Sequence, residues 1–129
     1  MPELPPAARF LVVDDNGDSR FLLVKTLLRK FPNASIKETH DAEEALDLAR
    51  TSDLTAVITH RTMDMDGLEL LRAFREKNPR VPILMVSSVD RAVPALASGA
   101  NRFMLYDEWL RTGSIVEEMI TQQDASLTH

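Results

Sequence analysis

The fold is decided at residues 10–15, which read FLVVDD. Four apolar residues form a short strand-like run, and two adjacent carboxylates, Asp14 and Asp15, follow it at once. Near-continuous apolar character in so short a run is typical of a strand buried on both faces of a parallel sheet. Neighbouring carboxylates repel each other, and ligands of open α/β sheets bind at the carboxyl ends of the strands. The pair therefore predicts a binding edge with a cation beside Asp14 and Asp15.

Strand-like and helical patterns alternate along the rest of the chain. The short apolar runs are Arg9–Val13, Ala34–Lys37, Thr55–Thr59, Pro82–Ser87 and Arg102–Leu105. Helical spacing separates them, with capping-box-like pairs that begin at Asp41 and Asp66. This alternation predicts an α/β, doubly wound fold with a parallel sheet. It forms one domain over residues 8–122, and we expect residues 1–7 and 123–129 to be flexible termini.

Two helix starts are ambiguous in the sequence. A helix ending at Gly99 could begin near Asp90, but an interior Pro94 would remove a hydrogen bond, so a later start would place Pro94 near its first position. The last helix has two possible starts as well. The spacing of Ser114 and Glu117 favours a start at Ser114, with residues 107–112 as an enlarged loop or an extra turn.

Composition excludes several classes of function. The 129 residues carry a net charge of −5, which argues against a nucleic acid as a direct partner. The absence of cysteine excludes disulfides, thiolate metal sites and thiol catalysis. No apolar run approaches the roughly 18 residues of a membrane span. We therefore expect a cytoplasmic protein that has no membrane association.

Four motifs in order resemble the receiver domain of response regulators, the phospho-acceptor module of two-component signalling. They are LVVDDN with Arg20, MDGLEL at residues 65–70, VPILMVSS at 81–88 and SGANRF at 98–103. The resemblance covers nearly the whole chain. It implies a (βα)5 flavodoxin-like fold with strand order 2-1-3-4-5.

The resemblance also implies a site. In the family an acidic pair holds Mg²⁺ beside an aspartate at the end of the third strand, and a histidine kinase donates the phosphoryl group to that aspartate. A Ser or Thr after strand four and a Lys after strand five contact the phosphate, because metal and lysine neutralise the developing charge. Asp14, Asp15 and Ser87 match three of these five positions.

The other two positions differ. Counting from Gly67, the acceptor position falls at Thr59, and counting from Gly99, the lysine position falls at Tyr106. A threonine hydroxyl cannot form an acyl phosphate, and Thr59 also removes one oxygen anion from the metal site. The sequence therefore indicates an atypical receiver that has lost phosphorylation, is not an enzyme and has no cofactor, with Mg²⁺ binding at Asp14 and Asp15 weak or lost.

Two residues after Thr59 bear on the acidic pair. Arg61 could pair with Asp14 or Asp15 and replace Mg²⁺ as a permanent cation; the simpler interpretation is that it points to solvent. Protonation of Asp14 would also relieve the pair. His60 could be a pH-sensitive lining of the pocket, but a solvated loop histidine is the default interpretation.

The resemblance further implies an interaction face on helix four, strand five and helix five. In this chain it would include Pro94, Phe103 at the switch aromatic, and the insertion at residues 107–113 with Trp109. Trp109 could be an apolar anchor at a contact site, although such residues more often cover the sheet end. The expected partner is a protein of the signalling pathway, namely a kinase, an output domain or another receiver, with a homodimer as one form.

Three competing interpretations remain. One is a residual Mg²⁺-dependent phosphoryl acceptor of non-standard geometry that uses Asp14, Asp15 or Thr59. Another is an ordinary receiver in which the acceptor aspartate has been replaced. The third takes the D-x-D-G sequence at residues 64–67 as the nucleophile motif of a haloacid-dehalogenase-type phosphatase, but helix capping by Asp66 explains it better.

Overall fold

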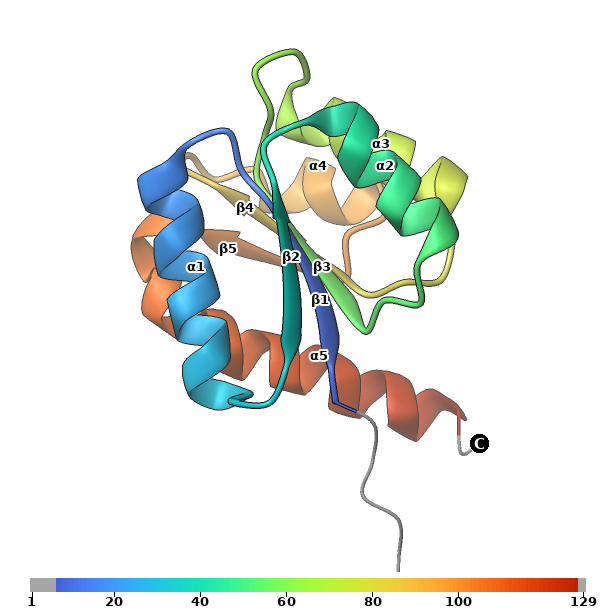
Figure 1. Ribbon diagram of the computed structural model, residues 1–129. Helices are drawn as coiled ribbons and strands as arrows, with labels where there is room; N and C mark the ends of the chain where they lie inside the picture. Colours follow the sequence, from blue (N-terminus) through green and yellow to red (C-terminus); the bar gives the residue numbers. More distant parts are fainter. Residues whose placement is uncertain (1–6, 128–129) are drawn as a thin grey trace, which may run out of the picture.

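Five parallel strands form a single sheet in the computed structural model, which describes residues 7–127. The strands are β1 (Arg9–Val13), β2 (Ser35–Thr39), β3 (Ala56–Thr59), β4 (Ile83–Ser87) and β5 (Arg102–Leu105), in the order β2-β1-β3-β4-β5. The helices are α1 (Gly17–Lys30), α2 (Ala42–Thr51), α3 (Gly67–Lys77), α4 (Ala92–Ala97) and α5 (Thr112–Leu127), with the 3-10 helix η1 (Tyr106–Arg111) before α5. The predicted doubly wound fold and strand order are confirmed (Figure 1).

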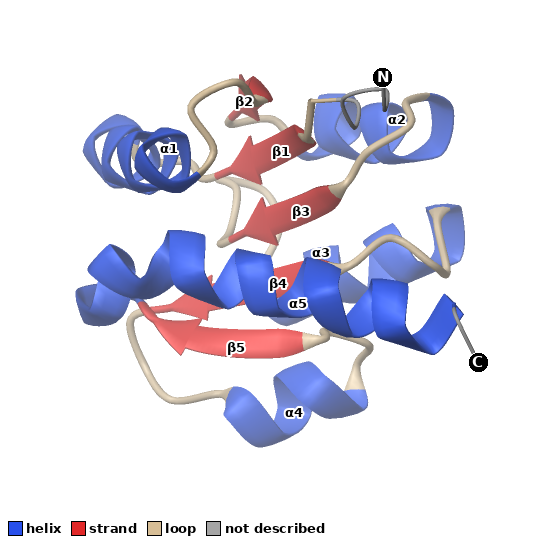
Figure 2. Ribbon diagram, turned by 90° about the horizontal axis from the view of Figure 1, so that it is seen from below, coloured by secondary structure: helices blue, strands red, loops and turns tan. Residues whose placement is uncertain are grey.

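Helices cover both faces of the sheet. Alternate residues of β1 point to opposite faces: Leu11 and Val13 pack with buried residues of α2, α3 and α4, whereas Phe10 and Val12 pack with those of α1 and α5. Figure 2 shows the sheet between these two helical layers. Burial on both faces explains the uninterrupted apolar runs of the central strands.

Side-chain caps fix three helix starts, and the sequence predicts two of them, at Asp41 and Asp66. The Asn16 side chain accepts a hydrogen bond from the Ser19 N–H at 2.9 Å, Asp41 from the Glu44 N–H at 3.0 Å, and Asp66 from the Leu68 N–H at 3.1 Å. These caps satisfy N–H groups that lack a partner within the first turn. Asp66 is therefore a helix cap, which agrees with the capping interpretation of the D-x-D-G sequence.

The two ambiguous helices are resolved differently. Helix α4 begins at Ala92, between the two predicted starts, and Pro94 lies in the first turn, where a missing N–H costs no intrahelical hydrogen bond. The start at Ser114 is wrong, because η1 runs directly into α5 at Thr112. The Thr112 backbone N–H and hydroxyl both donate to the Trp109 carbonyl, so the preceding turn replaces a cap.

The ends of the domain lie partly outside the described residues. Helix α5 continues to Leu127, so residues 123–127 of the predicted flexible tail are helical. Residues 1–6 and 128–129 are outside the described part of the chain, and the prediction of flexibility there stays a prediction. Within residues 7–127, no helix has the length and apolar character needed to cross a membrane.

Candidate functional site

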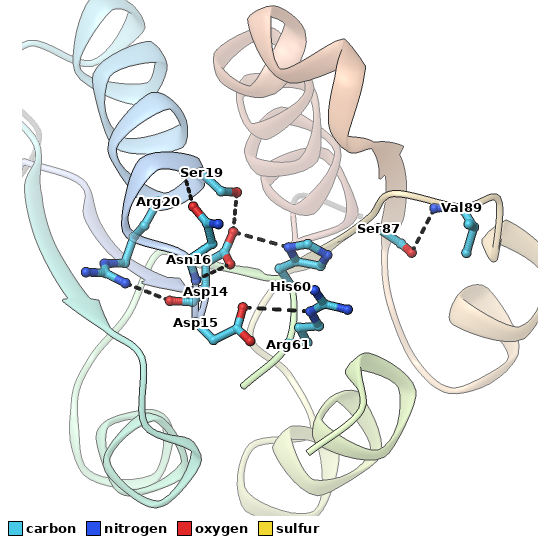
Figure 3. A network of polar contacts seen from close by, with 9 residues as sticks. All are labelled: Asp14, Asp15, Asn16, Ser19, Arg20, His60, Arg61, Ser87 and Val89. Carbon is cyan, nitrogen blue, oxygen red and sulfur yellow. Dashed lines mark hydrogen bonds and ion pairs between the residues drawn. The ribbon is translucent and has the colours of Figure 1, made fainter. Parts of the chain in front are cut away.

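The site lies where β1, β3 and β4 end, at the carboxyl edge of the sheet. Val13 pairs with Thr59, and Thr59 with Met85, so the segments that follow these strands are neighbours. Figure 3 shows Asp14 and Asp15 after β1 facing His60 and Arg61 after β3, with Ser87 set apart at the end of β4. The strand register therefore brings together residues that are 45 or more positions apart.

Asp14 is a buried and fully engaged carboxylate. Its side chain is 0% exposed. Oδ1 accepts a hydrogen bond from the Asn16 N–H at 3.0 Å, while Oδ2 accepts one from the Ser19 hydroxyl and lies 3.2 Å from Nδ1 of His60. Burial raises the pKa of Asp14, but the hydrogen bonds from His60, Ser19 and Asn16 outweigh it, so its pKa lies below the ordinary value. Asp14 is therefore ionised at neutral pH.

This pKa shift predicts an acid-dependent loss of stability. Because the folded-state pKa of Asp14 is below the unfolded-state value of about 4, its stabilisation is complete above that pH and is lost as pH falls through the folded-state pKa. Denaturant unfolding between about pH 6 and pH 2 should therefore give a shallower loss of stability for Asp14→Asn than for the wild type. The exposed-loop variant Asp53→Asn controls for net charge. Parallel curves for Asp14→Asn and the wild type would contradict the role of Asp14.

His60 is the residue that the sequence interpretation misjudged. Its side chain is 11% exposed rather than solvated, and its ring lies 6.4 Å from that of Tyr106 with the planes 9° apart. Since the ionised Asp14 can only accept, the Nδ1 of His60 carries the proton of their hydrogen bond. The sequence placed His60 directly after the third strand, at the edge where the acidic pair lies, but gave no signal for the direction of its side chain.

Both interpretations of Arg61, exposure to solvent and pairing with the acidic pair, are met in part. Its side chain is 63% exposed, yet Nε lies 3.7 Å from Oδ1 of Asp15, whose side chain is 18% exposed. The Arg61 carbonyl also accepts a hydrogen bond from the Asp15 N–H at 3.0 Å. An ion pair of this length and exposure contributes little stability, but it places a permanent cation beside Asp15.

Thr59 is buried without a polar partner. It is 0% exposed, and its Oγ1 is the single buried side-chain polar atom of the described residues that makes no hydrogen bond. An unsatisfied buried hydroxyl costs about 1–3 kcal/mol. The residue at the end of β3 is thus held as a core side chain.

Replacing Thr59 by valine should raise the free energy of unfolding by about 1–2 kcal/mol. Valine keeps the shape of the side chain and removes the unpaired hydroxyl. Thr39→Val is the matched control at another strand end, because the Thr39 hydroxyl accepts from the Asp41 N–H at 3.1 Å and its loss should be destabilising. Chemical denaturation measures both variants. A destabilised Thr59→Val would mean that the Thr59 hydroxyl has a partner in solution.

Ser87 and Tyr106 do not reach the acidic pair. The Ser87 hydroxyl accepts from the Val89 N–H at 3.3 Å, within its own loop. No hydrogen bond among residues 7–127 links the Tyr106 hydroxyl to Ser87, Asp14 or Asp15. A pocket of about 320 Å³ lies beside Asp15, His60, Arg61 and Tyr106, but neither Asp14 nor Thr59 lines it.

The comparisons with known proteins assign the family. A sequence profile of the response regulator receiver domain matches residues 10–106. The chain belongs to the response regulator receiver domain family. It is 32% identical over 125 residues to response regulator MprA of Mycobacterium tuberculosis and 33% identical over 123 residues to MprA of Mycolicibacterium vanbaalenii. It covers 51% and 50% of these relatives, so it spans about half of their length.

Solved receiver structures share the fold. A CheY-like receiver domain protein from Methanospirillum hungatei superposes with a TM-score of 0.79 at 20% identity, over 94% of this chain and 99% of that one. The signal receiver domain of the putative response regulator NarL from Mycobacterium tuberculosis gives 0.78 at 24% identity, over 91% and 98%. At these identities the likeness shows the fold alone.

The receiver's acidic edge does not fit the magnesium ion that the family implies. Both oxygens of Asp14 are used by protein donors, and Arg61 lies beside Asp15. Thr59 supplies no carboxylate at the third position. Among the described residues, no group of three or more carboxylate, histidine or cysteine side chains is arranged to hold a metal. These residues therefore do not form the magnesium site that the family implies.

The residues predicted for the interaction face separate into exposed and covered ones. Pro94 is exposed in the first turn of α4. Phe103 is partly buried against the core below α2 and α3, and Trp109 is partly buried against the core below α1 and α5. Trp109 thus packs against the core, and its role as an anchor at a contact site stays a prediction. Exposed apolar side chains in these elements include Val93 and Leu96 of α4, which sequence analysis did not single out, and Leu110 of η1.

Proposed function

We propose that this receiver acts in two-component signalling without phosphorylation of an aspartate, by presenting a surface to a protein partner. The observation that carries the proposal is Thr59, which stands buried and without a polar partner at the position that the family resemblance gives to the phospho-acceptor. A hydroxyl at this position cannot form the acyl phosphate on which the family's switch depends.

The surroundings of Thr59 support the same proposal. Asp14 and Asp15 have His60 and Arg61 as neighbours, which relieve the repulsion that a divalent cation relieves in the family. Tyr106, at the position of the family lysine, stacks near His60. Thr59 replaces the family's acceptor, Tyr106 replaces its lysine, and protein donors occupy the oxygens of Asp14. These differences are expected together in a receiver that keeps its fold, is not an enzyme and needs no cofactor.

The proposed contact surface is formed by α4, β5 and α5. Val93 is 81% exposed and Leu96 52% exposed on α4, and Leu110 of η1 is 64% exposed. The family resemblance suggests a kinase, an output domain or another receiver as the partner, including a second copy of this chain. MprA, of which the chain spans about half, is named a response regulator.

Treatment with acetyl phosphate and Mg²⁺, followed by intact-mass measurement, tests the proposal. We expect no mass increase corresponding to a phosphoryl group, while a phosphorylatable receiver treated in parallel verifies the donor. A phosphorylated product that maps to Asp14, Asp15 or Thr59 would overturn the proposal and favour the residual phosphoryl-accepting receiver. The double variant Thr59→Asp/Tyr106→Lys shows whether these two positions account for the difference.

A further inference from the structure

Helix α4 is short and weakly anchored by its own residues. It has six residues, of which Ala95 is the buried one. Its N-cap residue, Arg91, makes no side-chain capping hydrogen bond. Helices of this length are marginal without tertiary contacts, so the position of α4 must be set by groups outside it.

Arg75 of α3 holds the loop that follows α4. Its Nε donates to the Gly99 carbonyl at 2.7 Å, and Nη2 donates to Oδ1 of Asn101 at 2.8 Å. Its Nη1 donates to the Val81 carbonyl at 2.7 Å and to the Asn78 carbonyl at 3.2 Å. Arg75 thus joins α3 to the segments that precede β4 and β5.

Asn101 extends this connection into the sheet. Its Oδ1 also accepts from the Ile83 N–H at 2.9 Å, and its own N–H donates to the Ile83 carbonyl at 2.9 Å. The loop between α4 and β5 is therefore fixed to the first residue of β4 and to Arg75 at the same point.

Arginines also connect the other parts of α4 to α3. Arg91, at the amino end of α4, donates to Oδ1 of Asp66 at 2.7 Å. Asp66 is the N-cap of α3. Arg72 of α3 donates to the Ser98 hydroxyl at the longer distance of 3.5 Å. The two helices are thus linked near both of their ends.

Ser87 and Phe103 do not connect the acidic edge to the α4 surface by a hydrogen bond. The Ser87 hydroxyl accepts from the Val89 N–H in its own loop, and the Phe103 side chain has no hydroxyl group. We propose that Arg75, assisted by Arg91, is the positioning residue that sets α4 and the start of β5 relative to α3, and so fixes where Val93 and Leu96 are presented. Only the use of that surface rests on the proposed function.

The chemistry of arginine suits this task. A planar guanidinium donates several hydrogen bonds from a rigid fork, which a lysine ammonium cannot reproduce. The stem of Arg75 also fills the space beside Gly99, where an added Cβ would lie 2.6 Å from the Arg75 Cγ. Loss of the side chain would leave carbonyls unpaired and a gap under the end of α4.

Hydrogen exchange measured amide by amide tests the proposal on the whole chain. In Arg75→Met, the amides of residues 98–101 should exchange at least about tenfold faster relative to those of β1 and β3, because charged hydrogen bonds are lost locally. Methyl shifts of Val93 and Leu96, which face solvent, should also change as α4 moves. Arg75→Lys should not restore the wild-type pattern.

A milder variant keeps the test decisive if Arg75→Met does not fold. Arg91→Gln removes an exposed pair and should speed exchange at the start of α4 by about two- to fivefold. Arg50→Gln, which removes the exposed pair with Asp47 on α2, is the matched control and should leave α4 unchanged. For Arg75→Met, acceleration at residues 98–101 no greater than in β1 and β3 would overturn the proposal; for Arg91→Gln, unchanged exchange at the start of α4 would do so. No phosphoryl group enters this experiment, so it succeeds or fails independently of the proposed function.

Discussion

Replacing Gly99 by alanine is expected to lower the free energy of unfolding by about 2–4 kcal/mol. Gly99 has a φ of +110°, a conformation that residues with a Cβ rarely adopt. The new methyl group would also lie 2.6 Å from the Arg75 Cγ. Arg75 cannot easily yield, because its guanidinium is bonded to Gly99, Val81 and Asn101. Backbone strain and overpacking therefore add at one position.

Denaturant unfolding of the purified chain measures this effect. Gly17→Ala is the matched control, since an added Cβ there has the Arg20 Nη2 as its nearest neighbour at 3.9 Å and needs no unusual backbone conformation. We expect Gly17→Ala to be neutral or slightly stabilising. A Gly99→Ala variant as stable as Gly17→Ala would contradict the described packing of Arg75 against this turn.

Replacing His60 by alanine is expected to lower the free energy of unfolding by about 1–3 kcal/mol near neutral pH. Asp14 is ionised and buried, and the His60 imidazole is one of its two side-chain donors, with the Ser19 hydroxyl as the other. Removing the imidazole leaves a carboxylate oxygen with less compensation for its desolvation. The Tyr106 ring also loses its stacking neighbour.

His40→Ala is the control for this variant, because His40 is exposed and is expected to change stability by less than about 0.5 kcal/mol. Mg²⁺ affinity should rise in Arg61→Ala, which tests whether Arg61 replaces the metal ion beside the acidic pair. It should also rise in His60→Ala, because that variant frees an oxygen of Asp14. If His60→Ala is as stable as His40→Ala, the buried Asp14–His60 contact does not persist in solution.

The order and type of the elements could be predicted from the sequence because periodicity and capping are local signals. The runs Arg9–Val13 and Arg102–Leu105 agree with the strands residue for residue, and Asp41 and Asp66 cap the predicted helices. In the last helix, Val116 and Met119 are buried as expected. The start at Ser114 failed because a 3-10 turn supplied the hydrogen-bond partners that a cap would have supplied.

The site could be predicted only in part, because its contacts depend on strand register. Sequence placed Asp14, Asp15, Thr59 and Ser87 at one sheet edge. The structure brings Asp14 and Asp15 to the residues that follow Thr59, with Thr59 itself buried and Ser87 set apart. It could not say that His60 would turn inward to Asp14, since a histidine after a strand is equally compatible with solvent. Nor could it distinguish Arg75 from the exposed Arg72 of the same helix, because the partners of Arg75 lie in the loops before β4 and β5.

Under the proposed function, the edge of the sheet explains how the receiver fold stays stable without the family's phosphorylation site. The acidic pair keeps its place because Asp14 now anchors the start of α1 through Asn16 and Ser19, while His60 and Arg61 supply positive or donor groups where a metal would. Under this proposal, the positions that form the phosphorylation site in other members of the family stabilise the fold in this receiver. We propose that the surface of α4, which arginines from outside the helix hold in place, contacts the partner.

The most direct test is an amide-resolved NMR titration of the wild-type chain with Mg²⁺ and then with beryllofluoride, which mimics an acyl phosphate on aspartate. The account predicts that Mg²⁺ barely shifts the amides of Asp14, Asp15 and Arg61 and that beryllofluoride adds no further change. Saturable shifts on adding beryllofluoride, extending from Ser87 to Phe103, would show a working acceptor and a working switch. They would contradict the assignment of Thr59 to the acceptor position and the phosphorylation-independent function built on it.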